Sequence, residues 1–116
     1  MNSINQSEIE REILAAACED YTGLYEIIWA LNTSHPEIGE SEKIAAAATA
    51  VQSLLERGLI ELFSSEWETQ AHKPVSAKEF KRIANDVTAW RPEKIYFSFA
   101  ATDVGEKFYL GRHETI

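Results

Sequence analysis

Three stretches in the first half of the chain have apolar residues three and four positions apart, which is the spacing of a helix with one buried face. They predict helices over residues 7–19, 22–31 and 41–57. Gly58 directly follows the third stretch, as expected for a helix C-terminus. A residue able to cap a helix N-terminus stands at the start of each: Ser7 (in a capping box with Glu10), Thr22 and Ser41.

The pattern changes after Gly58. Residues 59–63 and 95–100 are short, apolar and partly aromatic, which predicts two strands. The thirty or so residues between them contain a capping box, Ser76 with Glu79, which predicts a short helix over 77–85. Thr102 is expected to cap a closing helix.

Two motifs in this order resemble the winged-helix domain family. Residues 54–60 read LLERGLI, which is similar to the family's L-x-x-x-G-L-I junction between recognition helix and wing. Residues 99–105 read FAATDVG, which is similar to the aromatic-x-apolar-T-x-x-G passage from the wing into the closing helix. The resemblance implies one α+β domain over residues 1–116, with a three-helix core, a two-stranded antiparallel wing and a closing C-terminal helix. The wing would carry an unusually long helical insertion at about 64–94.

Charge is unevenly distributed along the chain. Eleven basic and nineteen acidic residues give a net charge of −8, which disfavours contact with nucleic acid and acidic membranes. Residues 1–72 hold thirteen acids and three bases, whereas residues 73–94 hold six bases and three acids. The basic segment either folds back onto the acidic body or contacts a partner.

The sequence offers little for catalysis. Its single cysteine, Cys18, follows no metal-ligand spacing, and its three histidines, His35, His72 and His113, lie in separate predicted loops or ends. No phosphate-binding glycine loop or paired carboxylate site is present. No apolar run is long enough to span a membrane, and no signal peptide is recognised. We therefore expect a cytoplasmic protein that is not an enzyme and needs no metal or cofactor.

Helix 41–57 would lie in the DNA major groove in a DNA-binding winged helix. With Ile44, Val51 and Leu55 facing the core, its outer face would carry one base, Arg57, while Lys43 flanks the inner stripe between acids. The outward set is expected to be Glu42, Ala46, Thr49, Ser53 and Arg57, with Ala50 and Glu56 beside them. The candidate contacts to a partner or to nucleic acid are Lys78, Lys81, Arg82, Arg91, Thr49, Ser53 and Arg57.

The second predicted helix carries a second apolar face. Tyr25 and Trp29 lie one turn apart, about 100° from the main apolar stripe. They are expected to form extra core covered by the insertion or the closing helix, or alternatively an exposed patch that docks a partner or a second copy. Trp67 and Trp90 bracket the insertion and are expected to anchor it.

These features favour a non-catalytic binding or regulatory module whose partner is a protein or a second copy of the chain. The alternative is a DNA-binding transcriptional regulator that uses helix 41–57 and the basic insertion.

Overall fold

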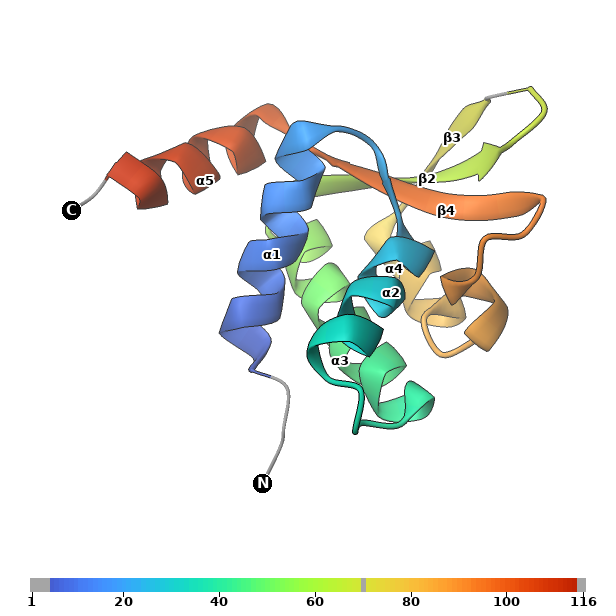
Figure 1. The fold of residues 1–116 in the computed structure, drawn as a ribbon. Coiled ribbons are helices and arrows are strands. Elements are labelled where there is room, and N and C mark those ends of the chain that lie inside the picture. Colours follow the sequence, from blue (N-terminus) through green and yellow to red (C-terminus); the bar gives the residue numbers. More distant parts are fainter. Residues whose placement is uncertain (1–4, 70, 115–116) are drawn as a thin grey trace.

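The computed structural model describes residues 5–69 and 71–114, with side chains as far as residue 111 (Figure 1). It is an α+β fold, as predicted. Its elements follow the order α1 (Gln6–Glu19), β1 (Thr22–Gly23), α2 (Leu24–Ser34), α3 (Glu40–Glu56), β2 (Ile60–Glu66), β3 (His72–Val75), α4 (Ala77–Ile83), the 3-10 helix η1 (Val87–Trp90), β4 (Ile95–Ala101) and α5 (Asp103–Glu114).

The strands form an antiparallel sheet in the order β1-β4-β2-β3. The predicted pairing of the two central strands is confirmed, with Leu62 opposite Phe99 and Ile60 opposite Ala101. The prediction of two strands was wrong, because β1 and β3 are added at the edges. β1 has only two residues, and β3 contains Pro74, which is tolerated at an edge because proline has no N–H to donate.

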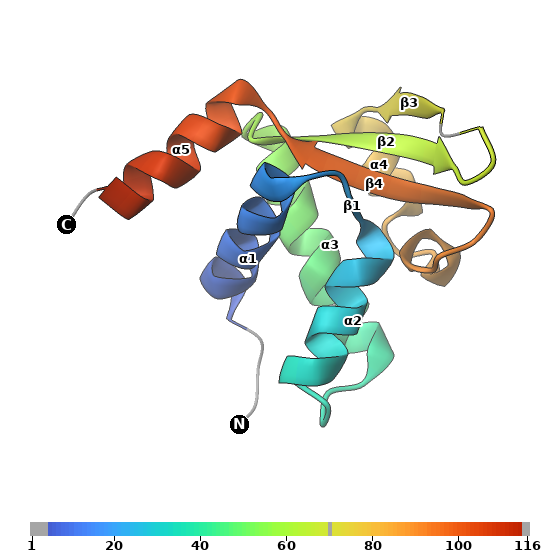
Figure 2. The ribbon, with the colours of Figure 1, turned by 45° about the horizontal axis from the view of Figure 1, so that its top comes forward.

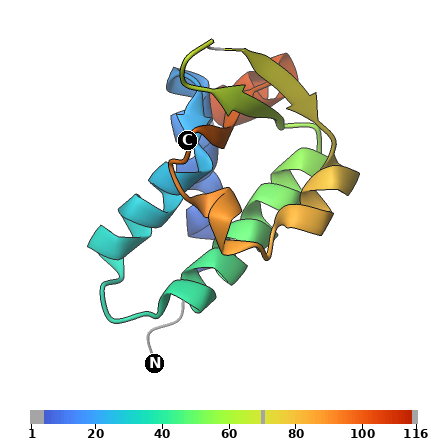
Figure 3. The ribbon, with the colours of Figure 1, turned by 90° about the vertical axis from the view of Figure 1, so that its right-hand side faces the viewer.

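The insertion is shorter than expected because β2 continues to Glu66, so the segment between the central strands is 67–94 and not 64–94. It first adds β3 as a hairpin partner of β2 and then forms α4, which lies beside α3 (Figure 3). The predicted insertion helix is confirmed, and it begins with the expected capping box of Ser76 and Glu79.

Helices α1, α2 and α3 pack on one side of the sheet (Figure 2). Ile44 and Val51 are buried as predicted, whereas Leu55 is only half-buried. Leu54 faces the core more completely than Leu55 does. The most deeply buried apolar side chains include Leu24, Val51, Leu54, Leu62, Phe80 and Phe99.

The first three helix starts differ from the prediction. Asn5 caps α1, its Oδ1 accepting the Glu8 N–H at 3.0 Å, so Ser7 lies inside the helix. Gly23 and Gly39 occupy the N-cap positions of α2 and α3, in place of Thr22 and Ser41. Thr22 instead joins the sheet edge. Extended backbone before each helix decides these boundaries, and side-chain preference alone does not locate them.

Two glycines control how the sheet meets the helices. Gly58 has φ +71°, a left-handed conformation that ends α3 and favours glycine. Thr102 caps α5 as predicted, because its Oγ1 accepts the Gly105 N–H at 2.9 Å. Gly105 lies directly against the backbone of Leu59: a Cβ at Gly105 would be 1.9 Å from the Leu59 carbonyl oxygen.

Gly105→Ala is therefore expected to destabilise the fold by about 1–3 kcal/mol or more, because backbone must move to admit one methyl group. Urea denaturation followed by circular dichroism measures the loss. Gly111→Ala is the matched control, since a Cβ there has no atom within 4 Å. Equal stability changes at both positions would contradict the close approach of α5 and Leu59.

Candidate binding surface

Four aromatic side chains from separate parts of the chain meet at one edge of the sheet. We call Tyr25, Trp29, Trp67 and Tyr96 the aromatic patch. Tyr25 and Trp29 of α2 meet edge-to-face with centroids 4.8 Å apart, and Trp67 stacks on Tyr96 of β4 at 4.3 Å. Tyr25 joins the two pairs, lying 6.0 Å from Tyr96 and 6.3 Å from Trp67.

Both tryptophans of the aromatic patch are open to solvent. Trp29 is 56% exposed and Trp67 is 48% exposed. The expectation that Tyr25 and Trp29 form extra core was wrong for Trp29, because the insertion and α5 leave it uncovered. Tyr25 is half-buried, and burial, with Glu26 and Tyr96 nearby, raises the pKa of its hydroxyl. It therefore stays protonated at neutral pH.

Hydrogen bonds hold Trp67 in place while one face of its ring stays exposed. The Trp67 indole N–H donates to the carbonyl of Glu93 at 2.8 Å, and its backbone N–H donates to that of Lys94 at 3.4 Å. These bonds join the start of the insertion to its end. A side chain fixed in this way loses little further conformational freedom when a partner binds.

A second ring cluster lies on the sheet, where Tyr21 stacks on His72 at 4.9 Å and meets Phe63 at 5.5 Å. His72 belongs to strand β3 and not to a loop as expected. Beneath these rings, Ser65 Oγ lies 2.7 Å from His72 Nδ1 and 2.9 Å from Ser98 Oγ. Both serines are buried, so their hydroxyls form hydrogen bonds with each other and with His72 inside the fold.

Two residues of α3 are more buried than the sequence indicated: Ala50, expected beside the outer face, and Lys43, expected to flank the inner stripe. Ala50 is fully buried. Lys43 is 5% exposed and its Nζ donates to Asn32 Oδ1 at 2.8 Å. Thr49 is exposed as expected, and Ser53 is half-buried.

Arg57, the one predicted base on the outer face of α3, is engaged within the chain. Its Nη1 lies 2.9 Å from Glu10 Oε1, and its guanidinium lies 5.1 Å from the centre of the Phe108 ring. Arg57 therefore connects the end of α3 to α1 and α5. A contact to DNA phosphate would compete with both interactions.

The insertion brings its basic residues beside α3. Lys81 and Asn85 line one shallow groove together with Thr49, Ser53 and Glu56 of α3. Arg91 pairs with Glu40 at 3.6 Å, so this base does fold back onto the acidic body. Lys78, Lys81 and Arg82 are exposed, and none makes an ion pair within the residues that the structure describes.

Reversing charge with Lys81→Glu and Arg82→Glu together is expected to change the free energy of unfolding by less than about 1 kcal/mol, since exposed charges contribute little to stability. The same change is expected to slow association with an acidic partner surface. Thermal melting and partner recovery measure the two effects. A sharply lowered melting temperature would show that these bases hold the insertion in place.

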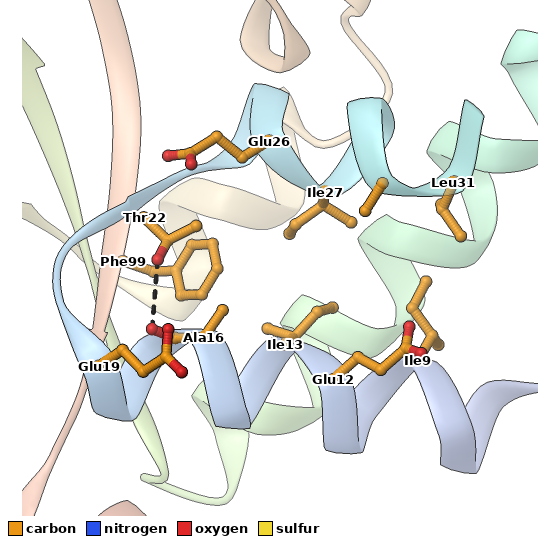
Figure 4. Close-up of a pocket in the computed structure, with 11 residues that line it drawn as sticks. Ile9, Glu12, Ile13, Ala16, Glu19, Thr22, Glu26, Ile27, Leu31 and Phe99 are labelled. Atoms are coloured by element: carbon orange, nitrogen blue, oxygen red, sulfur yellow. Dashed lines mark hydrogen bonds between the residues drawn. The ribbon is translucent and has the colours of Figure 1, made fainter. Parts of the chain in front are cut away.

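A pocket that the sequence did not reveal opens between α1 and α2 (Figure 4). Its residues come from two helices, the β1 edge and β4, so no local motif marks it. Apolar side chains form its interior, and three glutamates, Glu12, Glu19 and Glu26, stand among the lining residues.

Catalytic groups are scarce in the described part of the chain. No three His, Cys, Asp or Glu side chains there are grouped to hold a metal ion. Burial and the charge of Glu106 raise the pKa of the Cys18 thiol, which makes it a poor nucleophile. His35 ends α2, and the side chain of His113 lies outside the described residues. No described helix is long and apolar enough to cross a membrane.

No protein-family model, curated protein or solved structure matches this chain. The residues and their geometry offer binding surfaces.

Proposed function

We propose that the chain is a winged-helix module that binds another protein through the aromatic patch. The single observation that carries the proposal is the pair of half-exposed tryptophans, Trp29 and Trp67, held together by Tyr25 and Tyr96.

The order of elements supports the winged-helix assignment. Three helices precede a strand, a long insertion, an antiparallel strand and a closing helix. Gly58 ends α3 shortly before β2 begins, and Thr102 caps α5 directly after β4. These are the two places at which the sequence motifs occur. The Thr102 hydroxyl also donates to the Gly58 carbonyl at 2.6 Å, which ties the two motifs together.

The composition of the aromatic patch favours a protein partner. Tryptophan and tyrosine are the side chains that most often dominate binding energy at protein interfaces, because they bury large area at low entropic cost. Scattered exposed apolar residues are common, but these four rings are contiguous. Tyr25 also keeps a protonated hydroxyl available for a hydrogen bond.

A DNA-binding regulator is the second candidate. The observation that favours it is the position of Lys81 beside Thr49 and Ser53, with Lys78 and Arg82 also exposed on α4 and without an ion pair to any described residue. Against it, Lys43 is buried and Arg57 is paired with Glu10. At a net charge of −8, we expect binding to random duplex DNA at physiological salt to be no tighter than about 10⁻⁴ M.

Photo-crosslinking in cells that express the native protein tests the proposal. A benzophenone amino acid at position 29 or 67 is expected to give the same protein adduct, while the equally exposed Leu110 position gives none. Trp29→Ala is expected to weaken the recovered complex by about 30-fold, the effect of a 2 kcal/mol interface residue. Its melting temperature should stay close to that of the native chain.

Different adducts at positions 29 and 67, or equal adducts at position 110, would contradict the proposal. Sequence-dependent duplex binding that is lost in the Lys81→Glu, Arg82→Glu variant and kept in Trp29→Ala would establish the DNA-binding candidate instead.

A further inference from the structure

The pocket between α1 and α2 has a continuous apolar interior. Figure 4 shows Ile13 on α1 facing Ile27 on α2, with Phe99 of β4 at the sheet end. The interior is formed by buried side chains, namely Ile9, Ile13, Ile27, Leu31 and Phe99. The pocket lies between α1 and α2, each of which also contacts α3.

The pocket is large enough for a small organic molecule. Its volume is about 270 Å³. An apolar cavity of about 150 Å³ holds a benzene molecule, so this pocket can take a ring together with a short chain. Water inside it would meet few polar partners, because the interior residues are aliphatic or aromatic.

The polar residues that line the pocket give it a negative charge. Glu12 and Glu19 lie along α1, Glu26 lies on α2, and the lining contains no basic residue. Glu12 and Glu19 form no ion pair with any residue that the structure describes. Glu26 accepts the Gly23 N–H at 2.7 Å at the start of α2.

We propose that this pocket binds a small organic cation, with an apolar body between Ile13 and Ile27 and a positive group beside Glu12 and Glu19. The apolar interior selects a hydrophobic body, and the carboxylates favour a cation over a neutral or anionic group of the same shape. The site is separate from the aromatic patch, because α2 turns Ile27 into the pocket while Trp29 faces solvent.

Titration with 4-phenylbutylamine, followed by ¹H–¹⁵N correlation spectra, tests the proposal. Saturable shifts are expected at Ile13, Ala16, Ile27 and Ala30. The neutral alcohol 4-phenylbutan-1-ol should bind about three-fold more weakly, because it lacks the positive charge that the exposed carboxylates attract. The anion 4-phenylbutyrate should bind more weakly still.

Two kinds of variant test which carboxylates cause the preference for the amine and whether the ligand binds inside the pocket. Glu12→Gln with Glu19→Gln should reduce amine affinity to that of the alcohol, whereas Glu42→Gln with Glu61→Gln, which removes equal charge elsewhere, should not. Ala30→Phe places a ring at an exposed lining position and should abolish binding while leaving the melting temperature unchanged.

Absence of saturable shifts at the lining residues would overturn the proposal, as would equal affinity for amine and alcohol or equal losses in the two double variants. Trp29→Ala is expected to keep amine binding. The crosslinking result at positions 29 and 67 therefore stands or falls independently of this pocket.

Discussion

Phe99→Ala is expected to lower the free energy of unfolding by about 3–5 kcal/mol. Phe99 is fully buried at the centre of β4, opposite Leu62 of β2, and it separates the sheet from the helices that carry Ile13 and Ile27. Removing the ring forfeits its apolar burial and leaves a cavity that the sheet backbone cannot close. Urea denaturation followed by circular dichroism gives the value.

Two further variants keep this test decisive. Small domains are stable by only about 5–15 kcal/mol, so the denaturation curve of the alanine variant can lack a folded baseline. In that case Phe99→Leu gives a smaller, measurable loss of stability. Leu110→Ala removes an exposed side chain of α5 and should change stability by less than about 0.5 kcal/mol. Similar losses at positions 99 and 110 would mean that β4 does not face the core as described.

Trp90→Ala is expected to cost about 3–5 kcal/mol and to loosen the packing of η1 against α4 inside the insertion. Trp90 is 3% exposed, its indole N–H donates to the Ala84 carbonyl at 2.8 Å, and its ring meets Phe80 edge-to-face at 6.2 Å. These contacts join η1 to α4, and Phe80 is itself fully buried. Loss of the ring removes both the apolar burial and the hydrogen bond.

Hydrogen exchange measures where the Trp90→Ala loss occurs. Amides of α4 should exchange faster than those of β2 and β4 if the insertion opens before the rest of the fold. Trp90→Phe keeps most of the apolar burial and should lose less stability. If the Lys81→Glu, Arg82→Glu variant destabilised the chain as much as Trp90→Ala, surface charge and not aromatic packing would hold the insertion.

The candidate surface was only half predictable. Tyr25 and Trp29 are one turn apart on α2, so helical spacing was enough to mark them as a second apolar face. Trp67 and Tyr96 join them only because the β2–β4 pairing brings residues 29 positions apart in the chain next to each other. Their aromatic character was visible in the sequence, but the contact was not.

Burial of charge was equally dependent on packing. Arg57 stands at the predicted end of α3, yet its partners Glu10 and Phe108 come from opposite ends of the chain. Lys43 is buried on α3, and its ammonium group donates a hydrogen bond to Asn32 of α2. Helix periodicity gives the direction of a side chain relative to its own axis and does not identify the neighbouring element.

The sequence by itself determined the end of α3 at Gly58 and the capped helix inside the insertion, because each depends on interactions within a few residues. Its apolar repeats predicted the helices and central strands, and its resemblance to the winged-helix family implied the α+β class and the antiparallel strand pairing. Only the tertiary structure decided the two edge strands, the aromatic patch and the pocket between α1 and α2. Those features arise where elements distant in the chain pack together. They are stabilised by many contacts between segments, and these contacts cannot be read from any one segment of the sequence.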